Sequence, residues 1–282
     1  MSLRFSKMHS LGNDFVVIDA ISHPVHLSAG IARHIANRKL GIGCDQILLV
    51  EAPANGASEF MFRIYNADGS ESGQCGNGAR CFARFVRDNG LTSNEKIVVD
   101  TSSDTRMTLT LNDDNTVTVD MGAPRLAPAD VPFKAAGRQV TYDINVDDAV
   151  LSFGVVSMGN PHAVMIVDDV ESAPVDSIGP SVEHHERFPE RANVGFMEIV
   201  SRDHIRLRVH ERGVGETQAC GSGACAAVVS GRLRGLLNDH VDVDLPGGRV
   251  SVGFAGEAQP VFLRGDAVHV YDGELDTHGY DS

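Results

Sequence analysis

The stretch 75–81, CGNGARC, and the stretch 220–225, CGSGAC, open with nearly the same phrase. The second stretch follows the first by about half of a chain of 282 residues. A chain of this length exceeds what one ordinary core needs and favours two domains of roughly 100–200 residues each. The repeated phrase therefore indicates two related halves, each of which supplies one thiol.

Helical patterns follow each phrase, from Gly78 to a stop at 89–90 and from Gly223 to about Leu237. A third, amphipathic helix is predicted over 28–38, with Ser28 as its N-cap. Alternating apolar residues predict strands over 15–18, 105–111, 116–121, 194–200, 205–209, 241–245, 249–254 and 267–271. The predicted fold class is α+β, with two pseudo-symmetric α/β domains, each a curved mixed β-sheet or barrel around a central helix.

The domain boundary is placed near 121–124, where no linker rich in proline, serine or charge is found. We expect an N-terminal half, 1–121 plus about 265–282, that carries Cys75. The C-terminal half, 122–264, then carries Cys220.

Composition excludes several classes of function. The formal net charge of −14 argues against nucleic acid as a partner, because phosphate binding needs a concentrated basic surface. Arg80, Arg84 and Arg87 share one helix face and are predicted to form a solvated stripe without a function. The start has no apolar signal region and no stretch is apolar enough to span a bilayer, so we expect no membrane partner and a cytoplasmic protein. Five cysteines, an odd number, fit reduced thiols better than a framework of disulfide bonds.

The position of each repeated cysteine, beside a glycine-rich helix start, suggests chemistry. Unpaired backbone N–H groups and the positive end of the helix dipole favour a thiolate and lower its pKa. The same N–H groups bind carboxylates. Two such turns would hold one substrate carboxylate with a thiol on each side of its α-carbon, an arrangement that suits racemisation by two bases.

Other interpretations of the cysteines have less support in the sequence. Cys44, Cys81 and Cys225 are expected to fill the core, as buried cysteines commonly do. The cysteine spacings do not fit a zinc site, and the glycines lack the spacing of a dinucleotide fingerprint, so no metal or cofactor is predicted. A redox couple of Cys75 with Cys220 stays open as a side reaction. Paired-thiol proton transfer is the favoured interpretation.

The chain resembles the diaminopimelate epimerases along nearly its whole length. These are cofactor-independent enzymes that invert one α-carbon of diaminopimelate, in the pathway to lysine and peptidoglycan precursors. Besides the two cysteine phrases, the motifs that carry the resemblance are KMHSLGNDF (7–15), GIGCDQ (41–46), NADGS (66–70), GNPHA (159–163), ANV (192–194) and ERGVGET (211–217).

The resemblance implies two pseudo-symmetric domains with the active site in the cleft between them, and a homodimer. It implies Cys75 and Cys220 as the acid/base pair, with His162 and Glu211 assisting. The substrate-binding residues that it implies are Asn13, Gln46, Asn66, Gly76, Asn77, Asn160, Asn193, Arg212, Gly221 and Ser222. The sequence departs from the family pattern at Ser10 and over 71–74, which flank the site; Gln74 is expected to adjust packing beside the thiol.

Three alternatives stay open. A proline or hydroxyproline racemase uses the same paired-thiol logic, but it leaves the asparagines and Arg212 unexplained. A phenazine-type isomerase uses the fold without two thiols, which the presence of both Cys75 and Cys220 disfavours. An amino-acid binding module with structural cysteines would react slowly with iodoacetamide and keep its ligand affinity.

Overall fold

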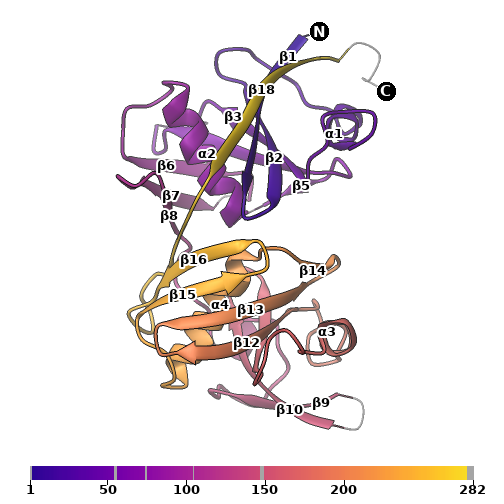
Figure 1. The fold of residues 1–282 in the computed structure, drawn as a ribbon, viewed down its shortest axis with the longest axis vertical. Coiled ribbons are helices and arrows are strands. Elements are labelled where there is room, and N and C mark those ends of the chain that lie inside the picture. Colours follow the sequence, from indigo (N-terminus) through magenta and orange to yellow (C-terminus); the bar gives the residue numbers. More distant parts are fainter. Residues whose placement is uncertain (1, 54–55, 74, 104, 147–148, 278–282) are drawn as a thin grey trace. The chain divides into compact units, whose positions relative to one another are not determined.

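The fold was analysed in a computed structural model, which describes residues 2–53, 56–73, 75–103, 105–146 and 149–277. Gln74 and the end of the chain, 278–282, lie outside the described residues. The chain divides into two compact units, Met1–Val119 with Gly265–Ser282, and Asp120–Arg264 (Figure 1). Among the described residues, no helix combines the length and the apolar character needed to cross a membrane.

The first unit is a mixed sheet with two helices. Its strands are β1 (Ser2–Ser10), β2 (Asn13–Asp19), β3 (Gln46–Glu51), β4 (Phe60–Asn66), β5 (Glu71–Ser72), β6 (Lys96–Thr101), β7 (Arg106–Leu111), β8 (Val117–Asp120) and β18 (Val268–Asp276). The helices are α1 (Ala29–Ala36) and α2 (Gly76–Asp88). The last strand, β18, returns to pair antiparallel with β1. One core cluster packs α1 against the apolar side chains of β2 and β3.

The second unit has its own set of strands and its own core. Its strands are β9 (Tyr142–Val146), β10 (Ala149–Ser157), β11 (Pro161–Ile166), β12 (Asn193–Ser201), β13 (His204–Glu211), β14 (Gly215–Thr217), β15 (His240–Leu245), β16 (Gly248–Gly253) and β17 (Phe262–Gly265). The helices are α3 (Val175–Glu183), α4 (Gly221–Leu233) and the short 3-10 helix η1 (Pro128–Asp130). A core cluster joins β9–β12 to α3.

The two units repeat one topology. In the first, β1–β2 is antiparallel, β2–β3 parallel, β3–β4 antiparallel, β4–β6 parallel and β6–β7–β8 antiparallel. In the second, the same succession runs through β10–β11, β11–β12, β12–β13, β13–β15 and β15–β16–β17. Helices α1 and α3 occupy equivalent connections, as do α2 and α4. The predicted α+β class and the pseudo-symmetry of its halves are confirmed.

Each unit wraps its strands around one helix, α2 in the first and α4 in the second (Figure 1). Close packing at the start of both helices favours glycine. A Cβ on Gly78 would lie 3.1 Å from Leu48 Cδ2, and one on Gly223 would lie 3.0 Å from Val209 Cγ2. The second glycine of each cysteine phrase therefore lets the start of its helix pack directly against the sheet.

The predicted helices exist, with shifted ends. Helices α2 and α4 begin at Gly76 and Gly221, two residues earlier than expected, so each cysteine is itself the N-cap. Helix α4 ends at Leu233 rather than near Leu237. Ser28 caps α1 as predicted, accepting a hydrogen bond from Ile31 N at 3.2 Å. The helix α3, the 3-10 helix η1 and the strands β1, β3–β6, β9–β11, β14 and β17 were not predicted.

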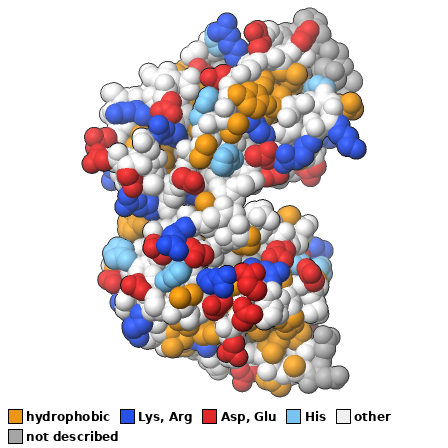
Figure 2. Space-filling model, in the orientation of Figure 1, with side chains coloured by type: hydrophobic (Ala, Val, Ile, Leu, Met, Phe, Trp, Pro, Cys, Tyr) orange, Lys and Arg blue, Asp and Glu red, His pale blue; other side chains and the backbone are white. Residues whose placement is uncertain are grey.

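Acidic and basic side chains are interleaved on the face of the molecule shown in Figure 2. On β13 to β16, for example, Arg208 pairs with Glu216 at 2.6 Å and Arg249 pairs with Asp244 at 2.5 Å. The basic groups of this sheet region are therefore matched locally by carboxylates.

Candidate active site

Three predicted residues of the first unit gather at one edge of its sheet. Asn13 opens β2 and Gln46 opens the parallel strand β3, so both lie at the same edge. Asn66 ends β4, which runs antiparallel to β3, and pairs in register with Gln46. Gln46 Nε2 donates to Asn66 Oδ1 at 2.9 Å. The sheet topology therefore brings together residues that lie far apart in the sequence.

Cys75 lies at the same place, as the half-buried N-cap of α2. Its Sγ accepts a hydrogen bond from Gly78 N at 3.3 Å. On its other side, Sγ lies 3.9 Å from Asn13 Oδ1. The thiol is thus held between a backbone donor of the helix start and a side-chain acceptor.

The side-chain amides of Asn13 and Asn77, near Cys75, are each held in one orientation by a charged neighbour. Asp45 can only accept, and it takes a hydrogen bond from Asn13 Nδ2 at 2.9 Å. Arg80 can only donate, and its Nη2 binds Asn77 Oδ1 at 2.9 Å. Asn77 must then turn its Nδ2 to Asn13 Oδ1, 3.4 Å away, and Asn13 must turn that oxygen toward the thiol.

Arg80 corrects the prediction of a solvated stripe. Its side chain is 0% exposed, whereas Arg84 and Arg87 of the same helix reach the surface. Its guanidinium also donates to Ser10 Oγ at 2.6 Å and to the carbonyl of Asp266 at 3.2 Å. Because strands wrap around the first turns of α2, the face that carries Arg80 is interior. Arg80 therefore ties β1 and the segment before β18 to the start of the helix.

We expect Arg80→Met to lower the free energy of unfolding by about 2–4 kcal/mol, because buried acceptors on Ser10, Asn77 and Asp266 lose their donor. The matched control is Arg84→Met on the same helix, whose ion pair with Asp88 is partly exposed; its effect should stay within about 0.5 kcal/mol. Urea unfolding of both variants checks this. Equal losses for the two would show that the Arg80 network contributes no more than a surface ion pair.

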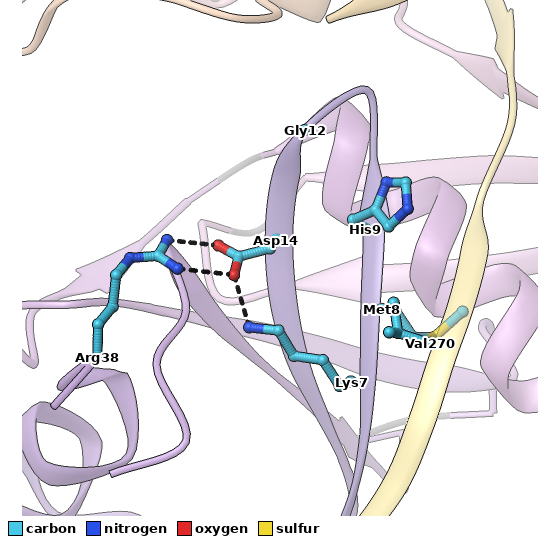
Figure 3. Close-up of a pocket in the computed structure, with 7 residues that line it drawn as sticks. All are labelled: Lys7, Met8, His9, Gly12, Asp14, Arg38 and Val270. Atoms are coloured by element: carbon cyan, nitrogen blue, oxygen red, sulfur yellow. Dashed lines mark hydrogen bonds and ion pairs between the residues drawn. The ribbon is translucent and has the colours of Figure 1, made fainter. Parts of the chain in front are cut away.

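A pocket of about 380 Å³ lies beside these residues in the first unit. Figure 3 shows Lys7 and Arg38 pointing from two sides to the Asp14 carboxylate, with His9, Met8 and Val270 across the strand. Lys7 Nζ lies 2.6 Å from Asp14 Oδ2, and Arg38 Nη2 lies 2.7 Å from Asp14 Oδ1. Burial would raise the pKa of Asp14, but these hydrogen bonds outweigh burial and hold it well below its usual value.

This charged cluster supports the asparagine beside the thiol. Arg38 Nη2 also binds Asp45 Oδ1 at 2.7 Å, and Asp45 N donates to Asp14 Oδ1 at 2.9 Å. Asp45 is thereby fixed where its second oxygen receives Asn13 Nδ2. Both cations of the pocket are thus engaged by carboxylates that position Asn13.

The second unit places its predicted residues at equivalent points of the repeat. Asn160 directly precedes β11, Asn193 opens β12, Glu211 ends β13 and Cys220 is the N-cap of α4. His162 on β11 pairs in register with Asn193. The positions of Asn13, Gln46, Asn66 and Cys75 are therefore matched in the second half of the chain.

Cys220 is buried and holds its proton. Burial, and then the negative charge of Glu211 and a hydrogen bond with it, raise the pKa of Cys220 well above its usual value. The hydroxyl of Ser222, 3.7 Å from Sγ, acts in the opposite direction but does not compensate. The expectation that the helix start lowers the pKa is therefore wrong for Cys220, because desolvation exceeds the effect of the helix end.

A chain of hydrogen-bonding groups runs from His162 to this thiol. His162 Nε2 lies 3.0 Å from Asn160 Oδ1, and Asn160 Nδ2 lies 3.5 Å from Ser222 Oγ. His162 is 1% exposed. Burial, assisted by the charge of Arg212, lowers the pKa of His162 to about 3, so its imidazole is neutral. His162 therefore orients Asn160 as a neutral hydrogen-bonding group.

Asn193 and Arg212 are joined through the backbone. Asn193 Oδ1 accepts from Arg212 N at 2.9 Å, and Asn193 Nδ2 donates to the carbonyl of Pro161 at 3.1 Å. The exposed Arg212 guanidinium donates through Nη1 to the carbonyl of Glu190 at 2.9 Å. Thr217 Oγ1 binds Glu211 Oε1 at 2.5 Å. Glu211 and Arg212 are thus anchored by their neighbours on β12 and β14.

Comparison with known proteins assigns the chain to a family. The family model described as diaminopimelate epimerase matches residues 5–127 and 154–270. The chain belongs to the diaminopimelate epimerase family. Both cysteine phrases lie within the matched residues, as do all the predicted site residues.

Solved structures share the fold of this family member at low sequence identity. A Bacillus anthracis phenazine biosynthesis protein of the PhzF family superimposes with a TM-score of 0.69 at 16% identity, covering 98% of this chain and 99% of the other. A hydroxyproline epimerase from Agrobacterium vitis, with bound trans-4-hydroxy-L-proline, gives 0.70 at 14% identity, covering 99% and 94%. A methylitaconate-delta-isomerase gives 0.69 at 10% identity, covering 98% and 95%. The fold of the diaminopimelate epimerase family is thus shared by epimerases and isomerases.

Sequence reasoning missed three residues that position the family's motifs, namely Asp45, Arg80 and Glu183. Asp45 lies inside the motif 41–46 and Arg80 lies inside the first cysteine phrase. Their location within these motifs was therefore a signal that they belong to the site. Glu183 lies on α3, a helix that was not predicted. The topological repeat itself could have indicated α3, because α1 fills the equivalent connection.

Proposed function

We propose that this chain is a cofactor-independent epimerase that interconverts LL- and meso-diaminopimelate by two-base proton transfer at the α-carbon. The observation that carries the proposal is the N-cap position of both thiols, Cys75 on α2 and Cys220 on α4, at equivalent points of a repeated topology. Membership of the diaminopimelate epimerase family supports it. The implied homodimer and cytoplasmic location stay predictions.

The proposed reaction balances without any further reagent. A thiolate removes the α-proton of the substrate, and the electron pair stays on the substrate as a carbanion. Backbone N–H groups of a helix start stabilise the carboxylate that shares this charge. The thiol of the other cysteine then gives its proton to the opposite face of the α-carbon, which inverts the centre and exchanges the roles of the two sulfurs.

The protonation state of Cys220 determines in which direction the ligand-free protein can begin epimerisation. Because its pKa is raised, Cys220 begins as the acid that donates a proton. For the reverse direction Cys220 must lose that proton first. Glu211, whose negative charge helps to retain that proton, opposes its release. Coupled thiols titrate together, so a pH–rate profile would report the pair.

Specificity for a substrate with a second amino-acid head is attributed to Asn66, Asn160, Asn193 and Arg212. The planar guanidinium of Arg212 suits a distal carboxylate, which it can bind through two parallel hydrogen bonds. In this structure the guanidinium is exposed and its Nη1 binds the carbonyl of Glu190. A proline-type substrate has no second carboxylate for this residue to bind.

Arg212→Lys should raise the KM for diaminopimelate by about tenfold or more, because a lysine keeps the charge but loses the bidentate fork. The kcat should change less, since the distal carboxylate is bound in both the ground state and the transition state. Steady-state kinetics with LL-diaminopimelate measure both constants. An unchanged KM would remove Arg212 from the distal site.

Proton NMR in D2O tests the proposed function directly. Reduced enzyme without added cofactor should remove the α-proton signal of LL-diaminopimelate while the meso form appears. Exchange with proline or hydroxyproline alone would identify the protein as a racemase of those substrates. No exchange with any of them, with the thiols shown to be reduced, would favour an amino-acid binding module.

A further inference from the structure

The turn that carries Glu211 and Arg212 is held by a buried carboxylate outside the motifs. Strand β13 ends at Glu211 and β14 begins at Gly215. Within the turn, Gly213 has a φ of 76° and its N–H donates to Glu183 Oε1 at 2.9 Å. The adjacent Arg212 N–H goes to Asn193. Two successive backbone donors of the turn are thus bound by side chains from elsewhere in the unit.

Glu183 also binds the strand that leads into the turn. Its Oε2 lies 2.8 Å from Nε2 of the buried His210, the residue before Glu211. Arg191 Nη1 and His184 Nε2 lie 3.7 Å and 3.9 Å from Oε1. The carboxylate therefore joins α3 to both His210 and Gly213, on either side of the two residues proposed to act on substrate.

The location of Glu183 is unfavourable for a carboxylate unless it has such partners. Its side chain is 4% exposed, and it is the last residue of α3, where the helix dipole disfavours negative charge. Burial would raise its pKa, but hydrogen bonds from His210 and Gly213 outweigh burial and lower it, so the group is ionised. The packing agrees, since a Cβ on Gly179 of α3 would lie only 2.7 Å from His210 Cγ. Gly179 thus lets α3 approach close enough for Glu183 to bind.

We propose that Glu183 is a positioning residue of the reaction, which fixes the turn 211–214 so that Glu211 meets Cys220 and Arg212 is presented to substrate. The inference rests on the proposed function for the roles of Glu211 and Arg212. Its structural part does not, because Glu183 binds Gly213 and His210 in the absence of substrate.

The test is the pH dependence of Cys220 alkylation in the substrate-free protein, followed by peptide mass spectrometry with iodoacetamide. In Glu183→Ala the turn loses its anchor and Glu211 no longer holds the proton of Cys220. The midpoint should fall, and alkylation below the midpoint should become about tenfold faster, because a neighbouring charge shifts a pKa by about one unit or more. The Cys220 peptide of Glu186→Ala, which alters an exposed neighbour of Glu183, is the matched control.

Kinetics and two further variants complete the design. Glu183→Ala should lower kcat/KM for diaminopimelate by about tenfold or more, since small displacements of positioned groups cost that much. Glu183→Gln, whose amide oxygen still accepts from Gly213, should recover most of both effects, and Glu186→Ala, at an exposed neighbour, should change neither. If Glu183→Ala does not fold, Glu183→Asp, which is too short to bind both partners, takes its place.

The outcomes separate cleanly. A shifted Cys220 midpoint with rescue by glutamine supports the inference. A loss of stability with an unchanged midpoint overturns it, because Glu183 would then be merely structural. If the midpoint shifts but the wild-type protein does not act on diaminopimelate, the positioning of Glu211 stands and the proposed function falls.

Discussion

Cys75→Ala and Cys220→Ala are each expected to lower the rate of epimerisation by about 10³-fold or more, because every turnover needs one thiolate base and one thiol acid. The two variants should differ in which epimer's α-proton they still exchange. The remaining sulfur can still remove and return a proton on the face that it reaches. One variant should therefore exchange the α-proton of the LL form without inversion, and the other that of the meso form. Proton NMR in D2O with each pure epimer measures both activities.

Each helix supplies its own control for these variants. Cys81 lies on α2 and Cys225 on α4, and both are fully buried in the cores of their units. Alanine at either position should leave the turnover number within about threefold of wild type, since neither is an N-cap. Near-normal epimerisation by Cys75→Ala or Cys220→Ala would refute the two-base scheme. Exchange of both epimers by a single variant would indicate that one base serves both faces.

The repeated cysteine phrase was sufficient to predict two related halves, and the helical and alternating apolar patterns predicted the α+β class and the two enclosed helices. Strong alternation likewise located strands such as β7 and β15 to within a residue or two. Helix α3 was missed for a physical reason. It begins after Pro174 without a side-chain cap and contains Gly179 and Pro180, so local propensity argues against it. Its apolar side chains Val175 and Val182 are stabilised by packing in the core of the second unit.

The sequence-based predictions that were wrong at the site failed because they depend on tertiary structure. Arg80 and Arg84 are four residues apart and share a face by spacing, but only the first turns of α2 are buried on every side, so Arg80 is interior. The pKa of Cys220 depends on the depth of the thiol and on Glu211, which a local argument about helix ends does not include. The family motifs named the residues that approach the thiols. The residues that orient them, Asp45, Arg80 and Glu183, follow from the hydrogen bonds alone.

Alkaline pH should destabilise the first unit through its two core thiols. Burial raises the pKa of Cys44 to about 12 and moves the pKa of Cys81 further above its usual value. An unfolded cysteine ionises near pH 8.5. Above that pH the unfolded chain has lost these protons while the folded unit retains them. The stability contributed by each protonated thiol is complete below pH 8.5 and is lost as the pH rises toward the folded pKa.

Each thiol lowers the free energy of unfolding by about 1.4 kcal/mol per pH unit, so the two together account for about 5 kcal/mol between pH 9 and pH 11. The double variant Cys44→Ala/Cys81→Ala should lose much of this slope, whatever its stability at neutral pH. Urea unfolding in a reducing buffer across this range gives the slopes. Val99→Ala, which truncates a fully buried side chain on β6 without removing a titrating group, should lower stability and leave the slope unchanged. If the double variant keeps the wild-type slope, the folded unit must release these protons as readily as the unfolded chain, and burial would not control the ionisation of its core thiols.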